Sequence, residues 1–277
     1  MWMTTSPDRM IVSKATVGEA ANPDILPLSG IRQGAGPFMV LLHGGVGSSM
    51  HWARNTGVLA QRFSITAFDL PGYGNSPDVP KDIAPDAYID WVVAAVATAS
   101  DRCHLVGFSF GGALAARVAA TLGEKIIKLS LLGAGGFGVP VGRVIPTTSV
   151  PGPEADIGAR RAAAASNLGQ WMLSAVPAVD DPVVDQQLSN IDRTRFNSRR
   201  VSHRATILDD LARIAAPVQF IWGAEDKLAH PSIQTRADAC RAVRGDISIA
   251  VVPGGGHWIQ YEQADRVNRL LMDFHGA

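Results

Sequence analysis

Short apolar runs recur along the chain and are separated by loops rich in glycine and polar residues. Runs of this kind are typical of strands buried in a parallel sheet. They predict strands over residues 38–42, 65–69, 103–106, 126–132, 218–222 and 247–252. Two less regular segments, 10–17 and 25–28, are candidates for the first two strands.

Apolar residues at helical spacing lie between several of these runs. They predict helices over residues 86–99 and 110–122, and a closing helix over residues 257–274. Strands that alternate with helices in this way predict an α/β fold with a mostly parallel central sheet and helices on both faces.

The pattern changes between Gly135 and Arg213, where no strand-like run occurs and segments 160–175 and 182–194 have helical spacing. We therefore expect an inserted helical cap over residues 135–213 and a core made of residues 1–134 and 214–277. Some apolar residues of this segment either line a substrate pocket or pack the cap onto the core: Trp171, Met172, Leu173, Val176 and Phe196.

Residues 107–112 read Gly-Phe-Ser-Phe-Gly-Gly and lie between a predicted strand and a predicted helix. In the pattern G-x-S-x-G the two glycines make room for a serine whose backbone is strained, so that its hydroxyl is held out of the turn. Ser109 is therefore the candidate nucleophile. In a chain with 28 glycines, an ordinary tight turn is the alternative.

A candidate acid and a candidate base follow two later strands. Asp226 comes after strand 218–222, and His257 follows a proline and three glycines after strand 247–252. The order serine, acid, histidine, each at the carboxyl end of a strand, places all three on one edge of the sheet. His257 would accept the Ser109 proton and Asp226 would orient the imidazole, with Glu225 as the rival acid.

The loop after strand 38–42 supplies further candidate groups. We expect the backbone N–H groups of Gly45 and Phe110 to form an oxyanion hole that stabilises developing negative charge. His43, at the end of the strand, is interpreted as a structural residue, and the role of His51 stays open.

Composition narrows the function classes. Lysine plus arginine and aspartate plus glutamate both number 25, so the chain has no net positive charge that would attract nucleic acid or an anionic membrane. Cys103 and Cys240 form neither a disulfide framework nor a metal-binding spacing. Neither a cluster of metal ligands nor a phosphate-cradling loop occurs, so no metal and no cofactor are expected. No leader and no apolar run of membrane-spanning length is present, and we expect a cytoplasmic protein with a small-molecule substrate.

Several motifs together resemble the α/β-hydrolase superfamily over nearly the whole chain. Besides the turn at Ser109, they are His-Gly-Gly at 43–45, Asp-Leu-Pro-Gly-Tyr-Gly-Asn-Ser at 69–76, Trp-Gly-Ala-Glu-Asp at 222–226 and Gly-His at 256–257. The resemblance implies an α/β-hydrolase fold and is silent on the substrate.

A narrower resemblance involves residues 133–138 and 256–270, which are similar to segments of meta-cleavage product hydrolases, the carbon–carbon bond hydrolases of aromatic catabolism. It implies a substrate carboxylate bound by a cap arginine, here Arg193 or Arg195, with Phe108 and Trp258 as further substrate contacts. Where this chain has Phe108 that family usually has asparagine, and the loss of a polar contact favours an apolar ester.

The sequence therefore predicts a cofactor-free serine hydrolase of a small, partly apolar ester or lactone. The alternative is carbon–carbon bond hydrolysis of a vinylogous diketone acid. A non-catalytic ligand-binding protein of the same fold ranks third, and a haloperoxidase-like side activity that uses the same triad stays open. The resemblance also leaves a homodimer open.

Overall fold

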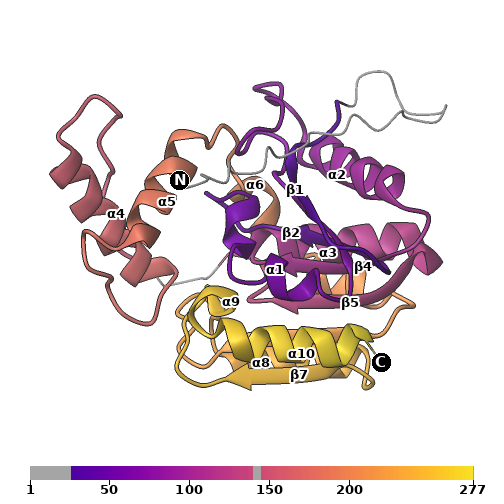
Figure 1. Cartoon of the computed structure of the whole chain (residues 1–277). Coiled ribbons are helices and arrows are strands. Elements are labelled where there is room, and N and C mark those ends of the chain that lie inside the picture. Colours follow the sequence, from indigo (N-terminus) through magenta and orange to yellow (C-terminus); the bar gives the residue numbers. More distant parts are fainter. Residues whose placement is uncertain (1–25, 140–144, 277) are drawn as a thin grey trace, which may run out of the picture.

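A seven-stranded sheet forms the centre of the computed structural model, which describes residues 26–139 and 145–276 (Figure 1). The strands are β1 (Gly30–Gln33), β2 (Phe38–Leu42), β3 (Ser64–Phe68), β4 (Cys103–Phe108), β5 (Ile126–Leu132), β6 (Val218–Gly223) and β7 (Ser248–Val252). Their spatial order is β1-β3-β2-β4-β5-β6-β7, and only β1 pairs antiparallel. The predicted mostly parallel sheet is confirmed.

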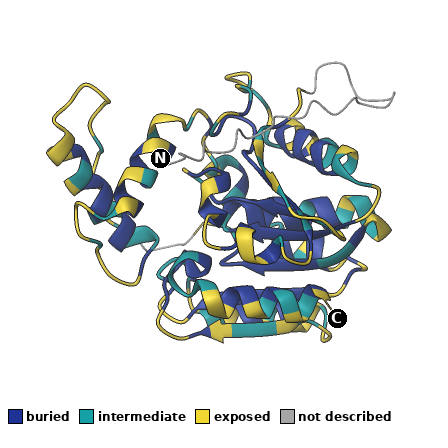
Figure 2. Ribbon diagram, viewed as in Figure 1, coloured by how far each residue is buried: buried dark blue, intermediate teal, exposed yellow. Residues whose placement is uncertain are grey.

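Helices cover both faces of the sheet, because residues of one strand alternate between the faces. Leu42 of β2 belongs to one apolar cluster, with α2 (Pro85–Ala99), α3 (Phe110–Leu122) and α8 (Ile233–Val243). Its neighbour Leu41 belongs to the other, with α1 (Thr56–Leu59), α9 (Ile259–Glu262) and α10 (Ala264–Gly276). The inner strands β2 to β6 are mostly buried, whereas the edge strands β1 and β7 are half-exposed (Figure 2).

The chain between β5 and β6 forms α4 (Ile157–Trp171), α5 (Pro182–Asp192), α6 (Arg199–Ser202) and α7 (Ile207–Leu211). Helices α4 and α5 lie to one side of the sheet (Figure 1), and Arg161 of α4 binds Asp185 of α5 through both carboxylate oxygens, at 2.7 and 2.8 Å. Helix α7 instead packs against α3, where the fully buried Asp210 accepts hydrogen bonds from Arg117 and Arg213. The cap boundaries at 135 and 213 stay a prediction.

The predicted apolar cap residues have different environments. Phe196 stacks on Tyr88 with 3.9 Å between ring centroids, and Leu173 is buried. Met172 packs against an apolar cluster, and Val176 is exposed. Phe196, Leu173 and Met172 therefore pack against other apolar residues, which favours the packing alternative for these three.

Several elements differ from the predictions. Segment 10–17 lies outside the described residues, and residues 26–28 are not a strand, because the first described strand begins at Gly30. That strand is a short, half-exposed edge strand without an apolar run. The predicted closing helix is two helices that are separated at Gln263, and α8 was missed because it buries only Arg236, Ala237 and Cys240.

Within the described ranges, no helix combines the length and the apolar character needed to cross a lipid bilayer. The cytoplasmic location stays a prediction.

We predict that Leu271→Ala lowers the free energy of unfolding by about 3 kcal/mol, because its side chain on α10 is fully buried against the sheet. Leu270→Ala is the matched control, because the adjacent leucine is only partly buried and should lose about 1 kcal/mol. Urea unfolding measures both values. Equal losses would contradict this orientation of α10.

Candidate active site

Ser109 lies in the sharp turn between β4 and α3, as the sequence predicted. Its φ of 53° and ψ of −113° are strained for a residue with a side chain. A Cβ atom on Gly107 would lie 2.3 Å from the carbonyl oxygen of Gly111, and one on Gly111 would lie 2.3 Å from that of Leu42. Both flanking glycines are therefore required by close backbone contacts.

The structure brings the predicted serine, histidine and acid together. His257 Nε2 lies 2.8 Å from Ser109 Oγ, and His257 Nδ1 lies 2.9 and 3.0 Å from the two carboxylate oxygens of Asp226. Asp226 and His257 are buried, whereas Ser109 is partly exposed. The arrangement permits a proton to move from the hydroxyl to an imidazole that the carboxylate orients.

Glu225, the rival acid, points elsewhere. Its carboxylate accepts hydrogen bonds from the backbone N–H groups of Gly254, at 3.3 Å, and Gly255, at 2.7 Å. These bonds connect the loop after β6 to the glycine-rich loop that precedes His257. The geometry therefore favours Asp226 as the acid.

Asp226 is kept ionised by its surroundings. Burial would raise the pKa of this carboxyl, but the charge of His257, its hydrogen bond and the Leu228 N–H together lower the pKa below its ordinary value. Asp226 therefore carries a negative charge at neutral pH, as required to stabilise an imidazolium.

The loop after β2 lies against the turn at Ser109, because Leu42 and Gly107 are paired in the sheet. A Cβ atom on Gly44 would lie 3.3 Å from Ser109 Cβ, and one on Gly45 would lie 4.0 Å from Phe110 Cβ. The backbone N–H groups of Gly45 and Phe110 donate no hydrogen bond within the part of the chain that the structure describes. Neither residue is among the described residues that line the cavity at Ser109, and the oxyanion hole stays a prediction.

Two buried histidines support this loop. His43 Nε2 accepts a hydrogen bond from Leu70 N at 2.9 Å, and its Nδ1 lies 2.7 Å from the Gly44 carbonyl oxygen. Burial lowers the pKa of His43 to about 4, so its ring is neutral at pH 7. His51 Nδ1 accepts from Gly44 N at 3.3 Å, and burial lowers the pKa of His51 as well. These contacts are consistent with a structural role for both histidines, because each ring binds backbone groups of the loop or its neighbours.

A cavity of about 350 Å³ opens at Ser109 and His257. Its lining includes the glycine-rich segment after β5, the aromatic ring of Trp171 and basic side chains from α6 to α8. The basic and aromatic lining residues are Phe137, Trp171, Arg199, His203, Lys227, His230 and Arg236. This cavity is the candidate substrate pocket.

Arg193 and Arg195, the predicted carboxylate ligands, do not line this pocket. Arg193 donates to Asn75 Oδ1 at 2.5 Å, and Arg195 pairs with Asp78 and donates to the Ser76 carbonyl at 2.7 Å. Both arginines instead connect the chain after α5 to the loop after β3. Of the basic residues that line the pocket, Arg199 and His203 lie within the arginine cluster at 193–204, whereas Lys227, His230 and Arg236 lie outside it.

Phe108 and Trp258, the other predicted substrate contacts, are also absent from the described lining. Phe108 is fully buried, with its ring centroid 5.0 Å from that of His257. Trp258 is fully buried too and donates to the His51 carbonyl at 3.1 Å. Phe108 packs against the base, because side chains alternate along β4 and place it with Val106 on the face away from α3. The Trp258 ring packs instead against His51 and Tyr261.

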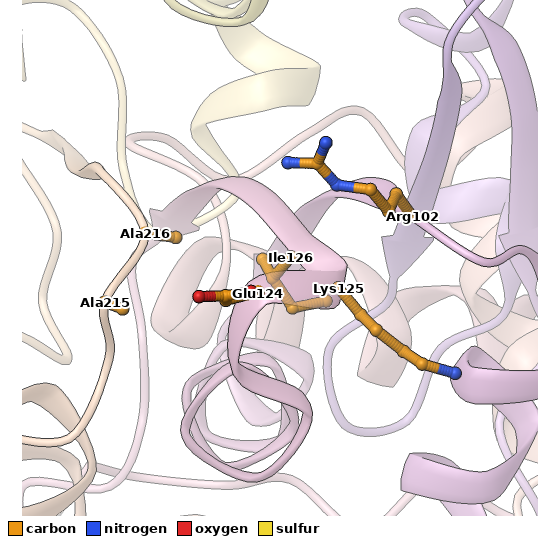
Figure 3. A pocket seen from close by; sticks show the side chains of 6 residues that line it. All are labelled: Arg102, Glu124, Lys125, Ile126, Ala215 and Ala216. Atoms are coloured by element: carbon orange, nitrogen blue, oxygen red, sulfur yellow. The ribbon is translucent and has the colours of Figure 1, made fainter.

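A second, more open cavity of about 490 Å³ lies where β5 begins, at the opposite edge of the sheet from Ser109 (Figure 3). Its lining residues are Arg102, Glu124, Lys125, Ile126, Ala215 and Ala216. None of the candidate catalytic side chains lies there. Within the described residues, no group of three or more His, Cys, Asp and Glu side chains is arranged to hold a metal ion.

The model of the α/β hydrolase family matches residues 39–270. A 2-hydroxy-6-oxo-6-phenylhexa-2,4-dienoate hydrolase of Burkholderia cepacia is 26% identical over 255 residues, which cover 87% of this chain and 88% of that enzyme. The predicted α/β-hydrolase fold and the resemblance to hydrolases of this kind are confirmed.

Two other relatives differ in their chemistry. The dihydrolipoyllysine-residue acetyltransferase component of the acetoin cleaving system of Pseudomonas putida is 27% identical over 250 residues, which cover 86% of this chain. Those residues span only 63% of that protein's length. The solved structure of a Bacillus subtilis carboxylesterase matches with a TM-score of 0.67 at 19% identity, covering 89% of this chain and 87% of that one. The likeness to the carboxylesterase shows that the two chains share a fold.

We predict that Gly111→Ala lowers the free energy of unfolding by about 2–3 kcal/mol, because the new Cβ would collide with the backbone of β2. Gly57→Ala is the control, since no atom lies within 4 Å of its Cβ position, and it should change stability by less than about 1 kcal/mol. Chemical denaturation compares the two. A wild-type stability for Gly111→Ala would refute the close contact.

Proposed function

We propose that this chain, which belongs to the α/β-hydrolase family, is a cofactor-free serine hydrolase that acts on a small, partly apolar ester or lactone. One observation carries the proposal. The contacts from Ser109 Oγ to His257 Nε2 and from His257 Nδ1 to Asp226 form a continuous hydrogen-bonded chain that ends in the pocket.

In the proposed first step, Ser109 Oγ attacks the ester carbonyl carbon while His257 Nε2 takes the hydroxyl proton. The negative charge that develops on the carbonyl oxygen is stabilised by the free N–H groups of Gly45 and Phe110. The carbon–oxygen bond to the leaving alcohol then breaks, and His257 returns the proton to that alcohol. The acyl group remains bonded to Ser109.

In the second step, His257 removes a proton from water, and the resulting hydroxide attacks the acyl carbon. The bond to Ser109 Oγ breaks, and the serine regains its proton from His257. The overall reaction consumes one ester and one water and releases an acid and an alcohol. Asp226 stays ionised throughout and stabilises each imidazolium.

Carbon–carbon bond hydrolysis of a diketone acid is the second candidate. It is favoured by the basic side chains of the pocket, since Arg199, Lys227 and Arg236 offer the carboxylate contact that the meta-cleavage resemblance implies. The relative that is named as a dienoate hydrolase also supports it. Because Phe108 is buried below the base, its ring does not contribute an apolar surface to the pocket.

We predict that Ser109→Ala lowers kcat at least about a thousandfold, because it removes the nucleophile. Steady-state assays with 4-nitrophenyl butyrate and with a coloured ring-fission dienoate measure this loss and also show which bond is cleaved. Urea unfolding checks that the variant is folded.

A fluorophosphonate probe supplies the matching control, since it reacts with an activated serine. The wild-type chain should be labelled at Ser109 and Ser109→Ala should not. Full activity in Ser109→Ala would remove the serine from the mechanism. Absence of both labelling and turnover in the wild type would favour a ligand-binding protein.

A further inference from the structure

Every ionisable side chain among the described lining residues of the pocket is basic. The set consists of Arg199, His203, Lys227, His230, Arg236 and His257. The chain as a whole has a net charge of zero, so this is a local excess of positive charge. The positive charge of the pocket therefore favours an anionic ligand.

The two arginines and the lysine of this set form no ion pair with a described residue. No carboxylate oxygen of a described residue lies within 4.0 Å of the charged nitrogens of Arg199, Lys227 or Arg236. Arg195 and Arg204, in the same region of the sequence, are both paired with aspartates. Arg193 and Arg200, outside the pocket, bind neutral groups too, so the pocket is distinguished by the clustering of three such cations around one cavity.

Arg236 is held in place by neutral groups. Its guanidinium donates to the carbonyl oxygens of Leu228 at 2.9 Å, His230 at 3.1 Å and Ala134 at 3.5 Å, and it lies 4.6 Å from the centre of the Phe137 ring. These bonds use three of its five N–H groups. Burial lowers the pKa of Arg236, whereas Asp226 raises it. The charge of Asp226 therefore already compensates part of the charge of this buried guanidinium.

Lys227 and Arg199 have more free donors. Lys227 Nζ makes one hydrogen bond, to the Gly169 carbonyl of α4 at 2.5 Å, which leaves two N–H groups. The Arg199 guanidinium lies 5.5 Å from the centre of the Trp171 ring. Its planar set of donors fits a carboxylate through two parallel hydrogen bonds.

Resting on the proposed hydrolase function, we propose that the substrate is a dianion with two carboxylates besides the bond that is cleaved. One carboxylate that binds the Arg199 guanidinium through both oxygens leaves the free donors of Lys227 unused. In the proposed mechanism the oxyanion of the reaction is bound by the N–H groups of Gly45 and Phe110 and does not need these side chains. Arg199 and Lys227, on separate segments, therefore match two carboxylates better than one, and Arg236 adds positive charge to the pocket.

Phosphate is the less suitable anion. Proteins commonly hold phosphate with several backbone N–H groups that converge at a helix N-terminus. Here the donors are separate side chains on α6, on the loop after β6 and on α8. Dispersed cations of this kind suit two carboxylates that are separated by a carbon chain.

Four aryl esters test the proposal by placing a carboxylate on the acyl chain, on the leaving group, on both or on neither. They are 4-nitrophenyl hexanoate, 4-nitrophenyl hydrogen adipate, 3-carboxy-4-nitrophenyl hexanoate and 3-carboxy-4-nitrophenyl hydrogen adipate. Alkaline hydrolysis of each ester corrects for intrinsic reactivity. We expect kcat/KM to rise about tenfold with each added carboxylate, the factor typical of one charge-assisted hydrogen bond. We also expect this preference to weaken as salt is added.

The variants Arg199→Gln and Lys227→Gln identify the residues responsible. The readout is the ratio of kcat/KM for the dicarboxylate ester to that for the neutral ester, so a general loss of activity cancels. Each variant should lower this ratio about tenfold, mainly through KM. Arg193→Gln is the matched control outside the pocket, and its ratio should equal that of the wild type.

Several results would overturn the proposal. They are equal ratios for all esters, no gain from the second carboxylate, unchanged ratios in both pocket variants, or preference for an ester in which phosphonate replaces carboxylate. Fluorophosphonate labelling separates this failure from that of the hydrolase proposal. A chain that is labelled at Ser109 but indifferent to substrate charge keeps the hydrolase and loses the dianion, whereas an unlabelled chain loses both.

Discussion

The close backbone contact between Gly111 and the carboxyl end of β2 determines the geometry of the active edge. A Cβ at this position would meet the carbonyl oxygens of Leu42 and His43 at 2.3 and 2.5 Å. The contact is possible only because α3 starts immediately after Ser109 and carries glycine at its second residue. It brings the Gly44–Gly45 loop against the turn that carries the nucleophile.

The same edge collects groups from strands that are far apart in the sequence. The parallel pairing of β4 with β5, β5 with β6 and β6 with β7 aligns the carboxyl ends of these strands. Ser109 follows β4, Asp226 follows β6 and His257 follows β7, so all three lie at this edge. Hydrogen bonds between loops then refine the alignment. Glu225 shows this most clearly, since its carboxylate holds the loop that carries the base and leaves Asp226 to face the imidazole.

The sheet, most helices and the candidate catalytic residues were predictable because each depends on local patterns and on strand ends. Ser109 lies between two glycines, and His257 follows a glycine-rich loop, so their positions follow from the order of the strands. The pocket cations were not predictable in the same way. Arg199 and Arg195 have the same chemistry, and only the packing of the chain around α6 decides which of them lines the pocket. The buried position of Phe108, by contrast, follows from alternation along β4 and was available from the sequence.

The backbone of Ser109 has a consequence for the stability of this protein. A φ of 53° is unfavourable for serine and costless for glycine. At this one position, thermal robustness and the reactive oxygen are therefore mutually exclusive. Under the proposed function, replacement of Ser109 by glycine would relieve the backbone strain and at the same time remove the nucleophile.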